Sequence, residues 1–532
     1  MNVINRMRGL ALALAATGLA VSVSAPGHAD APIFATATLH ADQPGPVINR
    51  DIYGQFVEDL GRSVYGGIYV GEASPIPNTQ GFRNDVIAAL REIRTPVIRW
   101  PGGCFADRYD WRDGIGPKAS RPVRINNWGG VEDSNAVGTH EYMAFAELVG
   151  AQTYVGGNVG TGSPREMAQW VEYMTSPSHS ALAEERRRNG RDKPFKLDFI
   201  GVGNEAWGCG GHMRPEHYVD LFRTFAPYLG VDGQALTKVA AGASGDNYAW
   251  TEAVMAGTTK LNMPNGGPPA LGALSLHYYT FAGDGPHHTG PATGFDEDHW
   301  IGAFANTLKM DELIAKHSAI MDKYDPAKHT ALFIDEWGAW YDTEKGTDPL
   351  LGYQQNTLRD ALIAAVNFDI FHAHADRVRM ANISQLANVL QALVLTDHEK
   401  MLLTPTYYVF DMYKVFQDAT ALPLDIQTPL YAYGGKSVPA VHGTAARGTD
   451  GAVHIGLVNL DPHRPATVGV SLTGLNARAV TGEIMTAEAM DAHNTYEAPT
   501  TLTPQPFRDA RLGGQTLTVN LPAKSVVVLD LR

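Results

Sequence analysis

The chain is poor in cysteine and in charged residues, and acidic residues outnumber basic ones. Two cysteines in 532 residues exclude a disulfide-dense scaffold and a cysteine-rich metal site. Charged residues make up 18% of the chain, below the usual quarter, which argues against a disordered or coiled-coil protein. The net charge is −14 and no basic stripe is visible, so nucleic acid and polyanionic substrates are not expected partners.

Long apolar runs are also lacking, with one exception at the N-terminus. Residues 9–23 follow Arg6 and Arg8 and precede the small residues Gly27 and Ala29. This stretch of about 15 residues is shorter than the roughly 20 needed to span a bilayer, and the pattern is typical of a secretory signal peptide. A retained membrane anchor is the alternative. We therefore expect residues 1–29 to be removed, and the mature protein to be free of membrane and exported to the periplasm or the medium.

Beyond residue 50, β-type runs alternate with helical spacing about eight times. The expected strands are residues 52–56, 96–100, 153–157, 199–202, 238–242, 273–277, 332–334 and 379–383. The expected helices are residues 82–93, 141–149, 165–174, 215–228, 307–324, 356–373 and 406–416, with one more near Trp250. Eight such units predict a parallel (β/α)8 TIM barrel over residues 51–417 rather than a doubly wound sheet.

The pattern changes after about residue 418. Short β-rich runs at 453–458, 468–472, 517–521 and 525–529 are separated by glycine, proline, aspartate and asparagine. They predict an all-β sandwich domain over residues 418–532. The strand-like run 33–39 has no place in the β/α alternation, so we expect residues 30–50 to join the sandwich.

Two glutamates follow barrel strands in similar settings. Glu205 lies in Gly-Asn-Glu-Ala-Trp-Gly after residues 199–202, and Glu336 in Asp-Glu-Trp-Gly after residues 332–334. In a TIM barrel the carboxyl ends of the strands meet at one mouth, where catalytic residues lie. Paired carboxylates in an aromatic-lined pocket are what glycoside hydrolysis requires, although a single such glutamate would more often be an ordinary loop residue.

Other strand ends add polar and aromatic groups. These are Glu58, Arg99, Trp100, Asn158, His277, Tyr278, Tyr279 and Gln385, with Trp128 and Trp340 in neighbouring loops. Together they offer hydroxyl partners and ring faces for a sugar. Each one alone could equally be a satisfied core group.

Several motifs resemble the glycoside hydrolase family 51 α-L-arabinofuranosidases. They are Trp-Pro-Gly-Gly-Cys-Phe-Ala-Asp at 100–107, Gly-Thr-His-Glu-Tyr-Met at 138–143, the segments 203–211 and 334–338, and Tyr-Gln-Gln-Asn-Thr-Leu-Arg-Asp-Ala at 353–361. The resemblance extends from about residue 52 to about residue 422. It implies a retaining, exo-acting enzyme that releases terminal α-L-arabinofuranosyl residues from arabinan, arabinoxylan or their oligosaccharides, without a cofactor.

The resemblance also implies roles for individual residues. Glu205 matches the general acid/base and Glu336 the nucleophile, while Asn204 matches a residue that holds the 2-hydroxyl of the sugar. The remaining substrate-binding positions are Glu58, Arg99, Cys104, His277, Tyr279, Trp340 and Gln385. Tyr278 replaces Tyr279 in this role if the strand register slips by one, and some family members carry asparagine in place of Cys104.

The two cysteines and a histidine cluster admit other interpretations. Cys104 and Cys209 both lie in expected barrel-mouth loops, and we expect two free thiols, with a disulfide as the alternative in an exported protein. His287, His288 and His299 lie near acidic residues in one long loop, where a solvated loop is favoured over a metal site. No metal site is therefore expected.

Two other functions are compatible with part of this sequence pattern. An endo-β-glucanase or β-xylosidase would use the same barrel and carboxylates with an open groove, and a periplasmic sugar-binding protein would not need the two strand-end glutamates. The sequence leaves the preferred polysaccharide and the oligomeric state open, a homo-oligomer included.

Overall fold

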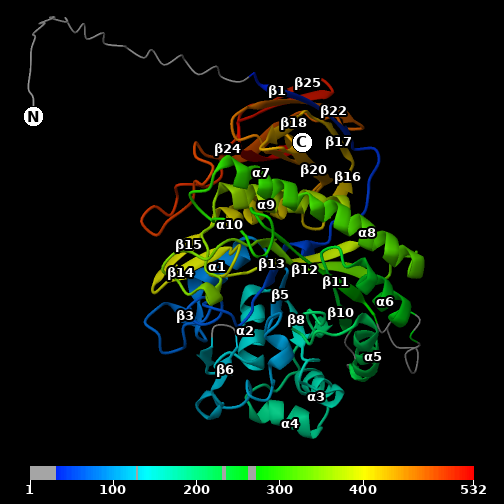
Figure 1. The fold of residues 1–532 in the computed structure, drawn as a ribbon, viewed down its shortest axis with the longest axis vertical. Coiled ribbons are helices and arrows are strands. Elements are labelled where there is room, and N and C mark those ends of the chain that lie inside the picture. Colours follow the sequence, from blue (N-terminus) through cyan, green and yellow to red (C-terminus); the bar gives the residue numbers. More distant parts are fainter. Residues whose placement is uncertain (1–30, 128–129, 231–234, 260, 262–270) are drawn as a thin grey trace, which may run out of the picture. The chain divides into compact units, whose positions relative to one another are not determined.

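The computed structural model describes residues 31–127, 130–230, 235–259, 261 and 271–532. Eight parallel strands close into a barrel (Figure 1), in the spatial order β10-β11-β12-β13-β2-β5-β8-β9. The strands are β2 (Gly54–Phe56), β5 (Val97–Trp100), β8 (Gln152–Gly157), β9 (Phe199–Val202), β10 (Thr237–Ser244), β11 (Ala273–Thr280), β12 (Ala331–Ala339) and β13 (Val378–Ser384). The predicted TIM barrel is confirmed.

Helices follow the barrel strands and cover the outside of the barrel. They are α1 (Asn84–Glu92), α2 (Thr139–Val149), α3 (Pro164–Thr175), α4 (Ala181–Arg188), α5 (Pro215–Phe225), α6 (Tyr248–Thr258), α7 (Glu297–Thr307), α8 (Lys309–Tyr324), α9 (Leu358–Ala373) and α10 (Pro405–Tyr413). Short 3-10 turns are η1 (Arg50–Tyr53), η2 (Ala106–Arg108), η3 (Lys118–Ser120), η4 (Ala226–Tyr228), η6 (Pro349–Leu351) and η7 (Lys414–Phe416). A capping box begins α3, where Ser163 Oγ accepts from the Glu166 amide and the Glu166 carboxylate accepts from the Ser163 amide. None of the helices within the described residues is long and apolar enough to cross a bilayer.

The rest of the described chain forms mainly a β-sandwich of two sheets. One sheet has the order β17-β1-β22-β26-β25 and the other β16-β20-β21-β27-β23-β24. Their strands are β1 (Ile33–His40), β16 (Thr420–Leu422), β17 (Leu424–Gln427), β20 (Val441–Arg447), β21 (Val453–Asn459), β22 (Ala466–Thr473), β23 (Val480–Thr486), β24 (Gln505–Pro506), β25 (Ala510–Gly513), β26 (Thr516–Leu521) and β27 (Ser525–Leu531). The N-terminal strand β1 runs parallel to β22 and antiparallel to β17, so both ends of the described chain contribute to the sandwich.

Four short hairpins complete the described elements. They are β3 (Asn78–Thr79) with β4 (Phe82–Arg83), β6 (Arg124–Asn126) with β7 (Val131–Asp133), β14 (Val394–Asp397) with β15 (Lys400–Leu403), and β18 (Leu430–Tyr433) with β19 (Lys436–Pro439).

Helix α9 joins the barrel to the sandwich, because it contacts both β12 and the sandwich strands β20 and β21. Every residue from Leu358 to His372 is buried, so apolar residues are not confined to one stripe of the helix. The polar residues Arg359, Asp360, Asn367, Asp369 and His372 are buried among them. His442 in β20 lies 2.9 Å from the buried carboxylate of Asp369. The sandwich is therefore packed on the barrel through apolar and polar contacts.

A β-bulge in β12 decides where the carboxylates of this strand point. Leu276 of β11 pairs with Ile334, but the next residue, His277, pairs with Glu336, so Asp335 is the extra residue. Bulges re-aim side chains and are frequent beside active sites. Consecutive side chains of a regular strand face opposite sides, whereas here both Asp335 and Glu336 reach the same guanidinium of Arg99. The sequence reading ended this strand at Ile334, whereas the structure continues it to Ala339.

Candidate active site

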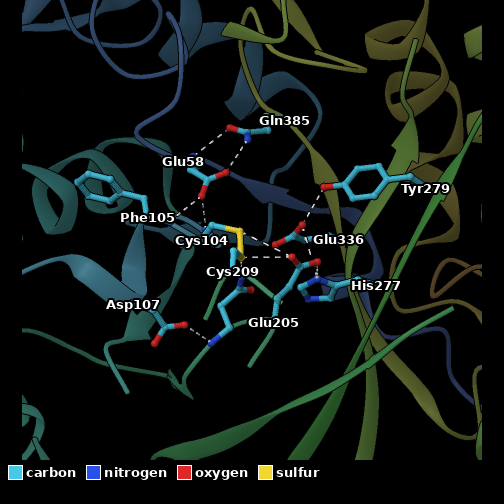
Figure 2. The surroundings of a disulfide bond; sticks show 12 residues. Glu58, Cys104, Phe105, Asp107, Glu205, Cys209, His277, Tyr279, Glu336 and Gln385 are labelled. Carbon is cyan, nitrogen blue, oxygen red and sulfur yellow. Dashed lines mark hydrogen bonds and ion pairs between the residues drawn. A yellow bond between two sulfur atoms is a disulfide. The ribbon is translucent and has the colours of Figure 1, made fainter. Parts of the chain in front are cut away.

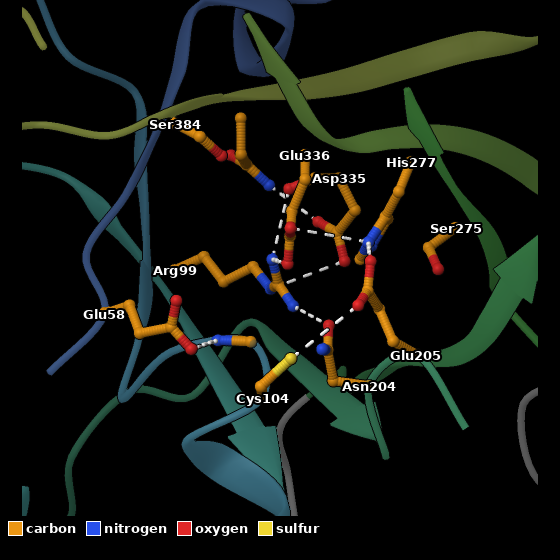
Figure 3. A network of polar contacts seen from close by, with 12 residues as sticks. Glu58, Arg99, Cys104, Asn204, Glu205, Ser275, His277, Asp335, Glu336 and Ser384 are labelled. Carbon is orange, nitrogen blue, oxygen red and sulfur yellow. Dashed lines mark hydrogen bonds and ion pairs between the residues drawn. The ribbon is translucent and has the colours of Figure 1, made fainter. Parts of the chain in front are cut away.

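The predicted site residues gather at the carboxyl ends of the barrel strands (Figure 3), and Arg99 at the end of β5 connects them. Its Nη1 donates to Glu336 Oε1 at 3.0 Å, and its Nη2 donates to Asn204 Oδ1 at 2.5 Å. Its Nε lies 3.5 Å from Asp335 Oδ2. The guanidinium also stacks on Phe56, 4.4 Å from the ring centre. A buried, multiply bonded arginine is a fixed positive charge beside Glu336.

Glu336 is buried and surrounded by hydrogen-bond donors and positive charge. Besides the bond from Arg99, Tyr279 Oη donates to Glu336 Oε2 at 2.8 Å. His277 Nδ1 lies 3.5 Å from the same oxygen. Burial alone would raise the pKa of this carboxyl, but the charges of His277 and Arg99 and the two hydrogen bonds outweigh it and lower the pKa. Glu336 is therefore held ionised.

Glu205 lies opposite in a different environment (Figure 2). Its Oε1 lies 3.0 Å from His277 Nδ1, and its Oε2 faces Cys104 Sγ at 3.7 Å and Cys209 Sγ at 3.4 Å. The sulfur atoms of a disulfide have no proton to donate. Burial raises the pKa of Glu205 and the nearby charge of Glu336 adds to this, against the opposing effect of His277. Glu205 is therefore the carboxyl that keeps a proton more readily.

The two carboxyl groups are close together. An oxygen of Glu205, an oxygen of Glu336 and a ring nitrogen of His277 all lie within 4.8 Å of one another. His277 contacts both carboxylates and its pKa is raised by Glu336 and Glu205, although burial opposes this. His277 Nδ1 thus lies between the pair, 3.0 Å from Glu205 Oε1 and 3.5 Å from Glu336 Oε2.

The backbone of Glu205 is held in an uncommon conformation, with a φ of 39°. Only a few per cent of non-glycine residues adopt positive φ. The turn that follows supports it, because the amides of Gly208 and Gly210 both donate to the Glu205 carbonyl, at 2.7 and 3.1 Å. Such strain is found at functional sites when the surrounding structure enforces it.

Glu58 and Gln385 form a pair at the ends of β2 and β13. Gln385 donates to Glu58 Oε2 at 3.3 Å, and Glu58 Oε1 accepts from the amides of Gly103 and Phe105, both at 3.0 Å. Burial, together with the charge of Glu336, raises the pKa of Glu58 to about 7. This pair holds the loop after β5 against the pocket.

The structure resolves the choice between two tyrosines. Tyr279 bonds Glu336, whereas Tyr278 Oη donates to the carbonyl of Asn306, 2.8 Å away on the outside of the barrel. Trp340 packs edge-on against Tyr279 with ring centres 5.3 Å apart, and 43% of its surface is exposed. Trp340 therefore presents a partly exposed aromatic ring beside Tyr279.

Two buried aspartates were missed as site residues by the sequence reading. Asp107 accepts from the amides of Val159, Gly160 and Asn204 at 2.7, 3.0 and 2.9 Å, and so ties the loops after β5, β8 and β9 together. Asp335 accepts from the side chains of Tyr154 and Asn382 at 2.7 and 2.8 Å. Both lie inside motifs that resemble the family, Asp107 in residues 100–107 and Asp335 in residues 334–338, and this was the available signal.

The expectation of two free thiols is wrong, because Cys104 and Cys209 form a disulfide. It links the loop after β5 to the loop after β9, across 105 residues of sequence (Figure 2). Both loops end at the same barrel mouth, and this proximity could not be read from the two separate motifs.

Three further predictions concern residues that lie away from the site or outside the described part of the chain. Trp128 and residues 1–29 lie outside the described part of the chain. Asn158 bonds Thr161 and the Tyr109 carbonyl rather than a site residue. In the histidine-rich loop, Asp296 caps α7 through the amide of His299 and also contacts the ring of that histidine.

Comparison with known proteins identifies relatives along nearly the whole chain. Residues 89–280 match the α-L-arabinofuranosidase 1 domain and residues 335–525 the α-L-arabinofuranosidase C-terminal domain. A protein of Bacteroides ovatus named intracellular exo-α-L-arabinofuranosidase is 48% identical over 94% of this chain and 96% of its own. One from Bifidobacterium longum, named intracellular exo-α-(1→5)-L-arabinofuranosidase, is 30% identical over 97% of this chain and 95% of its own.

A solved structure shares the same fold. The GH51 arabinofuranosidase from Xanthomonas axonopodis pv. citri superposes with a TM-score of 0.91 at 55% identity, covering 94% of this chain and all of the other. The two relatives named intracellular contradict the expectation of an exported, periplasmic or secreted protein, and that expectation is corrected here. Export was predicted from the composition of a short apolar stretch at the N-terminus, and from nothing else.

The match in sequence spans both the barrel and the sandwich, and the site built at the barrel mouth contains the paired carboxylates that the motifs implied. The chain belongs to the glycoside hydrolase family 51 α-L-arabinofuranosidases, and it is a glycoside hydrolase acting on arabinofuranosides.

Proposed function

We propose that Glu336 is the nucleophile and Glu205 the general acid/base of a retaining double displacement. The observation that carries this is that one oxygen of Glu205 lies within 4.8 Å of one oxygen of Glu336, with the pKa of Glu336 lowered and that of Glu205 raised. Retaining glycosidases hold their carboxyl groups about 5–5.5 Å apart, whereas inverting ones need about 6.5–9.5 Å to admit a water. The short separation supports direct attack by one carboxylate.

The steps follow from these environments. The ionised Glu336 attacks the anomeric carbon while Glu205 gives its proton to the leaving glycosidic oxygen. Forming the glycosyl ester removes the negative charge of Glu336, which lowers the cost of ionised Glu205 nearby. Glu205 then takes a proton from the water that attacks the ester, and Glu336 leaves as a carboxylate.

The other site residues are proposed to hold the sugar or to position the pair. Asn204 has its Oδ1 bonded to Arg99, which orients the amide so that its Nδ2 is available to a sugar hydroxyl. Residues Glu58, Cys104, His277, Tyr279, Trp340 and Gln385 complete the pocket in this proposal. We also propose the domain limits 30–50 with 418–532 for the sandwich and 51–417 for the catalytic barrel, with no cofactor and no metal.

The substrate class is proposed from the relatives. Their names describe exo-acting enzymes, which supports the release of terminal α-L-arabinofuranosyl residues from arabinan, arabinoxylan or derived oligosaccharides. An endo-β-glucanase or β-xylosidase is not favoured by these names. A sugar-binding protein without turnover would have no use for two carboxyl groups in opposed environments.

The test combines product analysis with two variants. NMR of the first product from 4-nitrophenyl α-L-arabinofuranoside should show the α-anomer, and an initial β-anomer would overturn the double displacement. Glu336→Ala should abolish turnover on every substrate. Glu205→Ala should lose orders of magnitude on poor leaving groups and far less on a dinitrophenyl glycoside, and azide should restore turnover with a glycosyl azide of retained configuration. Exchanged phenotypes would exchange the roles.

A polymer assay tests the mode of attack. Arabinan or arabinoxylan should yield monomeric arabinose with little early loss of viscosity. Rapid viscosity loss with oligosaccharide products would show an open cleft and favour the endo-acting alternative.

A further inference from the structure

The disulfide beside Glu205 places three metal-ligating side chains around one point. Cys104, Cys209 and Glu205 each offer a ligand atom, and these atoms lie within 4.8 Å of one another. All three residues are partly exposed rather than buried. Cys209 also lines a cavity of about 600 Å³, which gives a small ion a route to this cysteine.

The carboxylate presents a free edge to the two sulfur atoms. Glu205 Oε1 is engaged by His277, whereas Oε2 points toward Cys104 Sγ and Cys209 Sγ at 3.7 and 3.4 Å. A tetrahedral Zn²⁺ with bonds of about 2.3 Å to sulfur and about 2.1 Å to oxygen separates these atoms by about 3.6 Å. The oxygen–sulfur distances therefore already fit such an ion.

We propose that two-electron reduction of the Cys104–Cys209 disulfide by a dithiol converts this wall into a binding site for a thiophilic divalent cation such as Zn²⁺. The dithiol becomes a cyclic disulfide, and its two protons and two electrons yield two cysteine thiols. Zn²⁺ then displaces both thiol protons to solvent and binds two thiolates and the Glu205 carboxylate. The sulfur atoms must separate to about 3.8 Å, the spacing of two sulfur ligands in a tetrahedral site, and the fourth position is left for water.

The chemistry of the ligands selects the cation. Thiolate sulfur favours Zn²⁺ and other soft ions over Mg²⁺ and Ca²⁺, which prefer oxygen. In the oxidised protein the sulfur atoms carry no charge and cannot be thiolate ligands. Metal binding is therefore controlled by the redox state of the disulfide.

Occupation of this site slows turnover. The inhibition, unlike the binding, rests on the proposed role of Glu205 as acid/base, because a metal-bound carboxylate cannot hold the proton for the leaving group. General acid catalysis contributes about 10²- to 10⁴-fold, so a loss of at least about 100-fold is expected at saturation on a poor leaving group. A dinitrophenyl glycoside should lose much less.

The binding test uses Co²⁺ as a spectroscopic probe on the intact protein. The disulfide is reduced anaerobically with a trialkylphosphine, which takes up the oxygen of one water, and Co²⁺ is titrated in. One equivalent should produce the sulfur-to-cobalt charge-transfer bands and tetrahedral ligand-field bands of a thiolate site, and Zn²⁺ should abolish them. The oxidised protein should show neither.

Variants separate this site from the neighbouring Glu205–His277–Glu336 group, whose atoms also lie within 4.8 Å. The pair Cys104→Ser and Cys209→Ser should lose the bands, and Glu205→Gln should keep the charge-transfer bands with weaker binding. Bands that persist in the double-serine protein, no stoichiometric binding after reduction, or equal Zn²⁺ inhibition of oxidised and reduced enzyme would overturn the proposal. Thiolate bands with equal loss on both glycosides would uphold the metal site and refute the acid role of Glu205.

Discussion

Removing one hydroxyl, in Tyr279→Phe, tests how the nucleophile is kept ionised. Tyr279 Oη donates to Glu336 Oε2 at 2.8 Å, in a buried setting. A hydrogen bond to a charged group contributes about 1.5–3 kcal/mol, and one pKa unit corresponds to about 1.36 kcal/mol. The loss should therefore raise the pKa of Glu336 by about one to two units.

The sign of the effect on activity follows directly. Glu336 must be ionised to attack, and its pKa is lowered in the wild type, so the acid limb of kcat/KM reports its protonation. In Tyr279→Phe this limb should move to higher pH by about one to two units. The alkaline limb, which reports the proton on Glu205, should move little. The phenylalanine ring keeps the edge-on contact with Trp340, so the wall of the pocket is preserved.

Tyr278→Phe is the matched control, because the neighbouring hydroxyl bonds the Asn306 carbonyl instead of a carboxylate. The assay is the pH dependence of kcat/KM on 4-nitrophenyl α-L-arabinofuranoside, with circular dichroism to check folding. An acid limb that does not move in Tyr279→Phe, or moves equally in Tyr278→Phe, would refute this account of Glu336.

Three further changes probe the support of the site. Asp107→Asn should lower kcat by about 100-fold, because its amide group would face one of the three backbone N–H donors that Asp107 now accepts from and would shift the Asn204–Glu205 turn. Asp110→Asn, in an exposed turn, is the control, and equal kcat values for the two variants would contradict this role of Asp107. Gly103→Ala should lower kcat by a similar factor of about 100, because the added Cβ would lie 2.5 Å from Glu336 Oε1. Gly469→Ala in β22 is the control, because its Cβ would meet nothing within 4 Å. Full activity of Gly103→Ala would show that the carboxylate of Glu336 has room to move. Exhaustive EDTA treatment should leave the activity of the oxidised enzyme intact, and recovery that depends on one divalent ion would show a required metal.

The barrel was predictable because its signal is local and repeated. The strand at residues 199–202 was predicted with the limits the structure shows, since a β-rich run is defined within a few positions. The sandwich was read less completely. Strands such as β16 and β17 are three and four residues long and partly exposed, so their hydrophobic pattern is too short to stand out.

The residues of the site could be predicted from the sequence, but the contacts between them could not. The motifs named Glu205, Glu336, Arg99 and Asn204, yet nothing in the sequence showed that Asp335 would be a bulge residue or that Cys104 would bond Cys209. Both features depend on which strand ends become neighbours when the barrel closes. That information is three-dimensional, and the separate motifs do not contain it.

The different roles of the two glutamates follow from what closure brings to each carboxylate. Glu336 is buried and Glu205 is largely so, and burial by itself raises the pKa of both. Glu336 receives hydrogen bonds from Arg99 and Tyr279, whereas one oxygen of Glu205 faces the disulfide, which has no proton to give. Two like residues with like neighbours in sequence are thus driven in opposite directions by the side chains that closure of the barrel places against each carboxylate. The disulfide is part of this difference, so breaking it should change the pKa of Glu205 more than the pKa of Glu336.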